Sequence, residues 1–169
     1  MKLLIYADGG ARGNPGPAAV GVVLKKDGQT IKKYGEYIGE ATNNQAEYQA
    51  IIFGLKKTKL LFGKKKAKEI ELEFLTDSEL AARQLNHKYK IKEKELQPLF
   101  LKIWNLTIDF KNVSFSHILR EKNKEADALV NEALDSQSRE QKLVSSTSKC
   151  NTLIKSGIIK VYEKQTFNH

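Results

Sequence analysis

The sequence predicts an α/β fold in which a five-stranded mixed sheet begins as an antiparallel meander and continues with parallel strands. One observation is a pair of strand patterns, 18–26 and 30–39, that flank a turn at residues 26–28 and so indicate a hairpin. Another is that helical and strand patterns alternate from residue 41 onward, which is typical of units that add parallel strands.

Five segments have the length and residue types of strands. Residues 2–7 are apolar without strict alternation, so we expect a central strand, whereas 18–26 and 30–39 become progressively more exposed. Residues 112–119 form the fifth strand. The fourth, 68–77, alternates well, with Ile70, Leu72 and Phe74 on one face and Glu71 and Glu73 on the other.

The first predicted helix covers residues 41–63. Thr42 and Gln45 have the spacing of a capping box at its start, and Gly63 is placed to end it. Gly54 lies on its apolar face, where a missing side chain indicates close packing on the sheet.

Three further helices are predicted. A second capping box, Thr76 with Glu79, opens a helix over 78–86. An apolar helix spans 96–110, with Pro98 tolerated in its first turn, and the last helix spans 123–136.

Composition limits the class of protein. The chain has 169 residues, of which 40% are hydrophobic, so we expect one domain at 1–136 and a basic, serine-containing, partly flexible tail at 137–169. Within the tail, 157–164 is interpreted as a late strand or an apolar extension. The net charge of +9 favours an anionic partner such as nucleic acid.

Other classes are excluded by what the chain contains. The single cysteine, Cys150, excludes an internal disulfide and a cysteine-based zinc site. No apolar run reaches the roughly 18 residues of a membrane helix, and the apolar start of the chain is too short for a signal peptide. We therefore expect a cytoplasmic protein without a membrane partner, and no obligate protein partner is evident.

Four carboxylates stand where strands end or helices begin. Asp8 and Asp77 end the first and fourth strands, while Glu47 and Asp127 lie near the starts of two helices. If the two strands are parallel neighbours, their carboxyl ends share one edge of the sheet and the four acids converge. Such a cluster would repel itself unless hard divalent cations such as Mg²⁺ or Mn²⁺ bound it. Two such ions roughly 3.5–4 Å apart fit phosphodiester cleavage. Each acid taken singly is better explained by a turn or a helix start, and only the four together favour a metal site.

The motifs together resemble the ribonuclease H family, in a short form similar to archaeal and plant-like members of ribonuclease HI. The resemblance rests on YADGGARGNPGPAAVG, ATNNQAEYQA, LTDSELAARQLN and SHILREKNKEADALVNEA, in that order, over about the first 135 residues. It implies a ribonuclease H-like fold, with helices flanking the five-stranded sheet. It also implies an endonuclease that hydrolyses the RNA strand of RNA/DNA hybrids and leaves 5′-phosphate and 3′-hydroxyl ends.

The resemblance also assigns roles to residues. Asp8, Glu47, Asp77 and Asp127 match catalytic ligands of two Mg²⁺ ions, for which Mn²⁺ is a possible substitute, and Asp8 is the ligand that bridges them. His117 matches a histidine that assists proton transfer and product release. The substrate-binding positions are Gly9 and Gly10 for close backbone approach, Asn14, Asn43 and Asn44 for the RNA 2′-hydroxyls, and Thr42 for a DNA phosphate.

One residue departs from the family pattern, and the tail beyond Ser136 has no counterpart in it. Glu79 stands where several relatives have a substrate-contacting glutamine, so an acid lies beside the expected path of the phosphates. The short form lacks a lysine-rich inserted helix, and the connector KYKIKEKE is expected to do part of its work.

Other functions remain as alternatives. A binding module on the same fold that has lost catalysis would have lost at least one of the acids. A proofreading-type exonuclease would carry a second acid two residues after Asp8, and a transposase would have no need of the paired asparagines before Glu47. A detached fragment of a reverse transcriptase is the fourth possibility, against which the chain begins with Met directly before its first strand.

Overall fold

The computed structural model describes the backbone of residues 1–155 and the side chains of residues 1–142. The chain divides into two units, Met1–Leu134 and Asp135–His169. The segment 157–164, predicted as a late strand or an apolar extension, lies outside the described residues. Within the described part, no helix has both the length and the apolar character that crossing a membrane requires.

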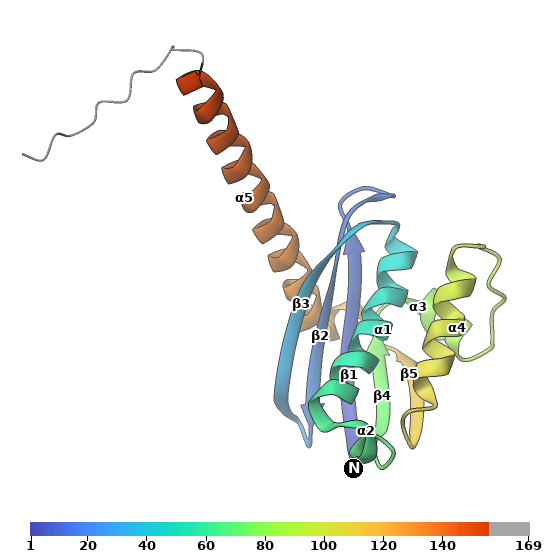
Figure 1. Cartoon of the computed structure of the whole chain (residues 1–169). Coiled ribbons are helices and arrows are strands. Elements are labelled where there is room, and N and C mark those ends of the chain that lie inside the picture. Colours follow the sequence, from blue (N-terminus) through green and yellow to red (C-terminus); the bar gives the residue numbers. More distant parts are fainter. Residues whose placement is uncertain (156–169) are drawn as a thin grey trace, which may run out of the picture. The chain divides into compact units, whose positions relative to one another are not determined.

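The first unit is built on a five-stranded mixed sheet with the order β3-β2-β1-β4-β5 (Figure 1). The pairs β1–β2 and β2–β3 are antiparallel, whereas β1–β4 and β4–β5 are parallel. This mixed sheet confirms the predicted fold class. Its elements are β1 (Lys2–Ala11), β2 (Gly16–Lys26), β3 (Gln29–Ala41), α1 (Asn43–Phe62), α2 (Lys64–Ala67), β4 (Glu71–Thr76), α3 (Glu79–Leu85), α4 (Leu96–Thr107), β5 (Asn112–His117), a 3₁₀ turn η1 (Arg120–Lys122) and the start of α5 (Lys124–Lys155).

The meander forms because the chain turns tightly between β2 and β3. Asp27 and Gly28 both have positive φ angles, 50° and 78°, which suits the twist of a two-residue hairpin turn. As the uninterrupted apolar run predicts, β1 is the central strand, and its Leu3 and Ile5 are fully buried.

Helix α1 covers one face of the sheet. The predicted capping box is present, since Thr42 accepts from the Gln45 backbone amide and the Gln45 side chain accepts from that of Thr42. A Cβ at Gly54 would lie 2.8 Å from a ring carbon of Phe74, so the absent side chain is what lets α1 settle on the strands. Gly63 ends the helix as expected.

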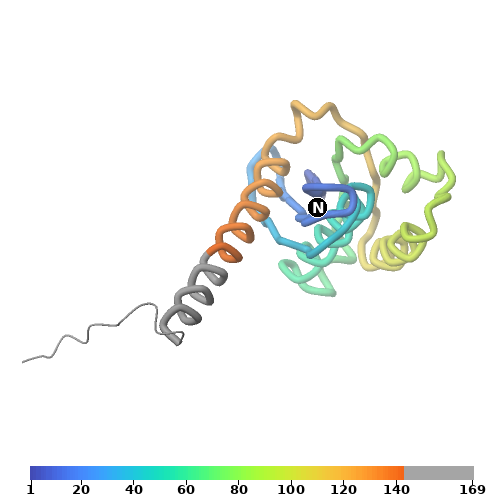
Figure 2. Tube along the Cα trace, turned by 90° about the horizontal axis from the view of Figure 1, so that it is seen from above, coloured from blue at the N-terminus to red at the C-terminus, as the bar shows by residue number. Residues whose placement is uncertain are grey.

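The first turns of α5 cover the opposite face (Figure 2). Gly21 pairs with Asp8 across β1 and β2, and both therefore face this side. A Cβ on Gly21 would lie 2.1 Å from the carbonyl oxygen of Ala126, so the helix backbone rests directly on the strand. This packing fixes where α5 begins relative to Asp8.

Two sequence predictions about helices were wrong. Helix α3 is capped by Ser78, whose hydroxyl accepts from the Ala81 amide, because Thr76 is still part of β4 and is fully buried. Glu79 instead forms an ion pair with Arg83, with an Arg83 Nη2 to Glu79 Oε1 distance of 2.6 Å. The last helix was expected to end at residue 136, and it continues to Lys155.

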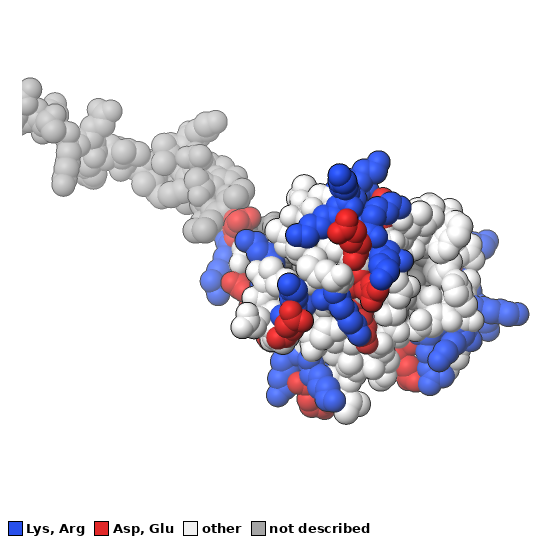
Figure 3. Space-filling model, turned by 90° about the horizontal axis from the view of Figure 1, so that it is seen from below, with Lys and Arg blue, Asp and Glu red and all other residues white. Residues whose placement is uncertain are grey.

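The excess positive charge does not gather where β1 and β4 begin. Basic and acidic side chains are intermingled on this end of the molecule (Figure 3). Lys2 Nζ lies 2.8 Å from Glu73 Oε2, and Lys111 Nζ lies 2.6 Å from Glu71 Oε1. Because these pairs are exposed, we expect each to contribute little to stability.

We expect Gly21→Ala to lower the free energy of unfolding by about 2–3 kcal/mol, because the new methyl group must displace the α5 backbone. Chemical denaturation measures the change. The matched control is Gly10→Ala, whose methyl would meet no backbone and only a side-chain methyl of Val130 at 3.3 Å, and which should cost below about 1 kcal/mol. Equal losses in the two variants would contradict the close contact at Gly21.

Candidate functional site

The site forms where β1 outruns its parallel neighbour. Pairing between β1 and β4 ends at Tyr6 and Leu75, although β1 continues to Ala11. Asp8 therefore stands on a stretch of β1 whose β4-side edge has no strand beside it. Asp77 is the first residue after β4. The parallel arrangement thus brings the two aspartates to one edge, as the sequence predicted.

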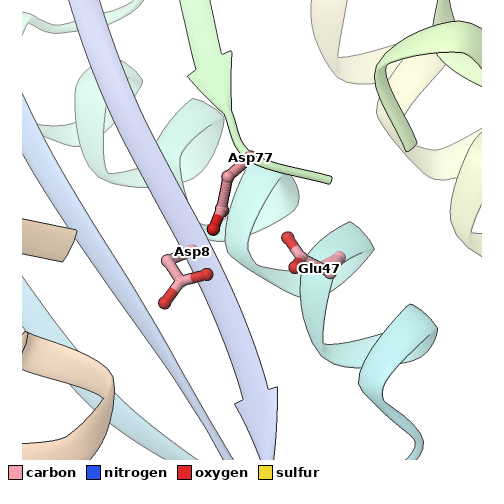
Figure 4. Close-up of side chains that lie close together, drawn as sticks. All are labelled: Asp8, Glu47 and Asp77. Atoms are coloured by element: carbon pink, nitrogen blue, oxygen red, sulfur yellow. The ribbon is translucent and has the colours of Figure 1, made fainter. Parts of the chain in front are cut away.

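Three of the four predicted carboxylates meet at this edge. Asp8, Glu47 and Asp77 each offer a carboxylate oxygen, and these oxygens lie within 4.8 Å of one another. They come from β1, from α1 and from the end of β4, and their side chains surround a common space (Figure 4). All three line an open cavity of about 380 Å³.

The cluster is electrostatically strained. Asp8 is only 8% exposed, and burial, together with the charges of Asp77 and Asp127, raises its pKa to about 7. Burial and the charges of Asp8 and Asp77 raise the pKa of Glu47 well above its usual range. Removing charged oxygens from water and placing them together favours either protonation or a bound cation.

All the donors of this cluster are carboxylate oxygens. Hard divalent cations with oxygen ligands, Mg²⁺ and Mn²⁺ among them, suit such a set, whereas a zinc site would include nitrogen or sulfur ligands. The residues therefore fit the predicted metal by their chemistry.

Two neighbouring side chains orient the cluster, and neither was predicted as a site residue. Asn123 is 1% exposed, and its Nδ2 donates to the carbonyl oxygen of Ala7 at 3.1 Å and to Asp77 Oδ1 at 3.0 Å. It supplies the hydrogen bond that a longer β4 would have given Ala7. Thr76 donates from its hydroxyl to Glu47 Oε2 at 3.4 Å. Asn123 belongs to the N-x-x-A-D pattern, the one sequence signal that pointed to it.

Asp127 lines the same cavity but stands outside the close group of three. Its Oδ1 lies 3.4 Å from Arg120 Nη2, and its Oδ2 accepts from Asn131 Nδ2 at 3.2 Å. Its charge nevertheless contributes to the raised pKa of Asp8, so it acts electrostatically on the cluster. In this structure Asp127 is therefore held by the guanidinium of Arg120 and the amide of Asn131.

Gly9 has a structural use in addition to the one predicted. We expected it to let a substrate backbone approach, yet a Cβ at Gly9 would lie 2.1 Å from the carbonyl oxygen of Ala46. The missing side chain therefore lets α1 approach β1, which carries Glu47 to Asp8. Gly9 and Gly10 both line the cavity, so the predicted substrate contact at their backbone stays a prediction.

The glycine-rich loop after β1 is tied to the start of α1. Asn43 Oδ1 accepts from the Ala11 amide at 2.9 Å, and Asn14 Oδ1 accepts from the Asn43 amide at 3.0 Å. Thr42 is occupied as the helix cap, although its hydroxyl proton can still be donated to a ligand. We call Asn14, Thr42, Asn43 and the next residue, Asn44, the rim of the site, and Asn43 lines the cavity beside the carboxylates.

The remaining predicted residues lie at the borders of the site. Asn44 is half-buried, and its Nδ2 donates to Glu93 in the connector between α3 and α4. His117 ends β5, pairs with Thr76 in the sheet and is exposed. Among the described residues, it is not one of those that line the cavity.

The chain resembles known proteins in both sequence and fold. Residues 6–133 match the family described as reverse transcriptase-like. The chain is 41% identical over 131 residues to ribonuclease HI of Halobacterium salinarum, covering 77% of this chain and 63% of that protein. It is 38% identical over 137 residues to a bifunctional protein of Mycobacterium tuberculosis, covering 80% of this chain and 36% of that one. The chain thus spans less than two thirds of these curated relatives.

Solved structures of RNase H1 proteins are similar to this chain as well. LC11-RNase H1, crystallised in complex with an RNA/DNA hybrid, is similar with a TM-score of 0.76 and 47% identity, over 80% of this chain and 98% of that one. RNase H1 from Halobacterium salinarum is similar with a TM-score of 0.74 and 40% identity, over 80% and 99% of the two chains.

The raised pKa of Asp8 makes stability depend on pH. The folded protein holds this proton more tightly than the unfolded chain, so the stabilising contribution is complete below about pH 4 and is lost as the pH rises through about 7. Asp8→Asn cannot ionise, and without metal it should exceed the original protein in stability above pH 7 by up to about 4 kcal/mol. The difference should vanish near pH 4.

Urea denaturation in a chelator across this pH range measures the effect. Asp27→Asn is the control, because 85% of that side chain is exposed and its carboxylate is not desolvated. A stability difference for Asp8→Asn that stays constant with pH would contradict the electrostatic strain.

Asn123→Ala should lower the free energy of unfolding by about 1–3 kcal/mol, because it leaves the carbonyl oxygen of Ala7 buried without its donor. Denaturation at neutral pH measures the change. Asn131→Ala is the matched control, since Asn131 is exposed and its loss should cost below about 0.5 kcal/mol. If both variants were equally stable, Asn123 would not be sealing the edge of β1.

Proposed function

Because the chain belongs to the ribonuclease H family, we propose that it is an endonuclease that hydrolyses the RNA strand of RNA/DNA hybrids, leaving 5′-phosphate and 3′-hydroxyl ends. The observation that carries the proposal is the group of Asp8, Glu47 and Asp77, whose oxygens lie within 4.8 Å of one another. A relative with 47% identity has been crystallised with an RNA/DNA hybrid, which supports the substrate class.

The proposed cofactor is a pair of Mg²⁺ ions, with Mn²⁺ as a substitute. Asp8, Glu47, Asp77 and Asp127 would hold them, and Asp8, at the centre of the electrostatic strain, would be shared. When bound, such ions activate a water molecule and stabilise the leaving oxygen of the phosphodiester.

Binding of the cations would displace the proton that Asp8 holds. The protein's own residues prepare the site for this step. Asn123 donates to Asp77 and Thr76 donates to Glu47, and both acids line the cavity. Since Asp8 holds a proton up to about pH 7, we expect metal affinity to increase with pH through that range.

Recognition of the RNA strand is proposed for the rim. Asn14, Asn43 and Asn44 carry carboxamides, which can both donate to and accept from a ribose 2′-hydroxyl. The backbone of Gly9 and Gly10 lines the cavity, where the scissile strand would lie. Thr42 would donate its hydroxyl proton to a phosphate of the DNA strand.

Two basic side chains complete the proposal. His117, exposed at the end of β5, would take up or release the proton that accompanies product departure. Arg120 lies beside Asp127 and lines the cavity, where it can neutralise a substrate phosphate. A cytoplasmic location and a tail unit distinct from the catalytic one stay predictions.

Cleavage of an end-labelled RNA/DNA hybrid tests the function, beside single-stranded RNA, duplex RNA and duplex DNA. We expect cleavage of the hybrid's RNA strand with Mg²⁺ or Mn²⁺ and none in a chelator. Asp77→Asn should lower the rate by at least about 10²-fold, because loss of a ligand exceeds the effect of losing an outer partner. Phosphatase treatment of the products reports the 5′-phosphate.

Asp27→Asn removes a carboxylate in the β2–β3 turn and should keep the original rate. Tight hybrid binding without cleavage under either metal would refute the enzyme and identify a binding module.

A further inference from the structure

We propose that Glu93 is a positioning residue that fixes the orientation of the Asn44 carboxamide, so that Asn44 Oδ1 accepts the proton of a ribose 2′-hydroxyl. This inference rests on the proposed function, because it assumes that the asparagine rim meets the RNA strand. It assigns a role in sugar discrimination to the connector between α3 and α4, a segment outside the carboxylate site.

The orientation follows from the chemistry of the contact. Asn44 Nδ2 lies 3.0 Å from Glu93 Oε1 and 3.3 Å from Oε2. A carboxylate can only accept hydrogen bonds, so the carboxamide must turn its NH₂ group to Glu93. Rotating the amide by half a turn would place two acceptors against each other. The Oδ1 atom is thereby left as the group that Asn44 offers to a ligand.

The connector that carries Glu93 is fastened to the body of the protein. Tyr48, one turn beyond Asn44 on α1, donates from its hydroxyl to Gln84 Oε1 at 2.8 Å, and Gln84 Nε2 donates to the Lys90 carbonyl at 3.3 Å. Ile91 packs against the main core, and its carbonyl accepts from Gln97. Burial and the charge of Glu93 raise the pKa of Tyr48 to about 12, so Tyr48 stays a donor.

The other two asparagines have the opposite polarity. Asn14 and Asn43 use their Oδ1 atoms as acceptors for backbone amides within the protein, which leaves their NH₂ groups to face a ligand. The rim therefore presents two donors and one acceptor. A 2′-hydroxyl can accept from the donors and donate to the acceptor, because it carries both lone pairs and a proton. A 2′ substituent without a proton leaves the Asn44 oxygen unpaired.

Glu93 also has an electrostatic cost. Its carboxylate is exposed beside the rim, so its negative charge weakens the approach of phosphates to this surface. Removing it should strengthen binding of any nucleic acid duplex while weakening discrimination at the 2′ position. Because the two effects differ in kind, a ratio of affinities separates them.

The experiment measures binding of two hybrids in the Asp77→Asn background with Mg²⁺, which prevents cleavage. Both contain the same DNA strand, and the RNA strand carries either 2′-hydroxyl or 2′-fluorine throughout. Fluorine keeps a ribose-like sugar shape but has no proton to donate. We expect Glu93→Ala to lower the preference for the hydroxyl strand by about three- to tenfold, the value of one hydrogen bond.

Glu95→Ala is the matched control, because it removes another exposed carboxylate from the same connector. The side chain of Glu95 makes no capping hydrogen bond to α4. It should change both affinities by one factor and leave their ratio unchanged. If Glu93→Ala also changed both affinities by one factor, the residue would act only through its charge and the inference would be overturned.

The side-chain amide signals of Asn44 in the free protein provide a second readout that needs no nucleic acid. We expect Glu93→Ala to move them and Glu95→Ala to leave them in place, and unmoved signals in the first variant would overturn the inference alone. If the protein without a Glu93 change bound both hybrids equally, the proposed role of the asparagines in reading 2′-hydroxyls would be refuted, and this inference with it.

Discussion

The whole site depends on one mismatch in the sheet, because β1 runs on for several residues after β4 has stopped pairing with it. An unpaired strand edge inside a protein leaves backbone groups without partners, and here the carbonyl of Ala7 is one of them. Asn123 supplies that partner from the start of the last helical segment and donates to Asp77 with the same amide. The repair of the sheet edge and the placement of a carboxylate are therefore a single interaction, which joins residues 116 positions apart.

The cluster at this edge is costly to the free protein. Asp8 is almost completely buried beside two other acids, and its pKa near 7 shows that the folded chain holds that proton more tightly than water-exposed aspartates do. Such clusters are typical of ligand sites, because a bound divalent cation replaces the repulsion between the carboxylates with attraction to the metal. Thr76 and Asn123 donate from neutral side chains, so they orient the acids without neutralising them. Arg120 lies beside Asp127, at the border of the site.

The sequence pattern predicted two strands well: Leu72 and Phe74 of β4 are buried in the alternation that the sequence displays, and the uninterrupted apolar run at 2–7 is the central strand β1. The convergence of Asp8 and Asp77 was also predictable, since it needs only that two parallel strands be adjacent. Asn123 and Thr76 were not, because hydrogen bonds between distant segments leave no local pattern.

The cap of α3 was misassigned because Thr76 and Ser78 are both suitable cap residues, and only burial of Thr76 in β4 decides between them. The close contact of Gly9 with Ala46 was not predictable either, because it joins two distant segments, and the predicted ligand contact of Gly9 stays a prediction. The end of the last helix was predicted too early, because the serine-rich, polar composition after residue 136 is typical of a linker, whereas the helix continues to Lys155.

A carboxamide is ambiguous as a recognition group, because either end can be presented to a hydroxyl and either end tolerates some other substituent. In this chain each of the three asparagines on the rim is held by a contact that removes the ambiguity: two are held by backbone amides and the third by Glu93. The first two contacts come from a loop and a helix start that the site needs in any case. The third comes from a connector whose other charged residues are mainly lysines, so an acid there opposes nucleic-acid binding. An acid that weakens affinity and fixes an acceptor trades binding strength for selectivity, which is the balance expected where many duplexes compete for one surface.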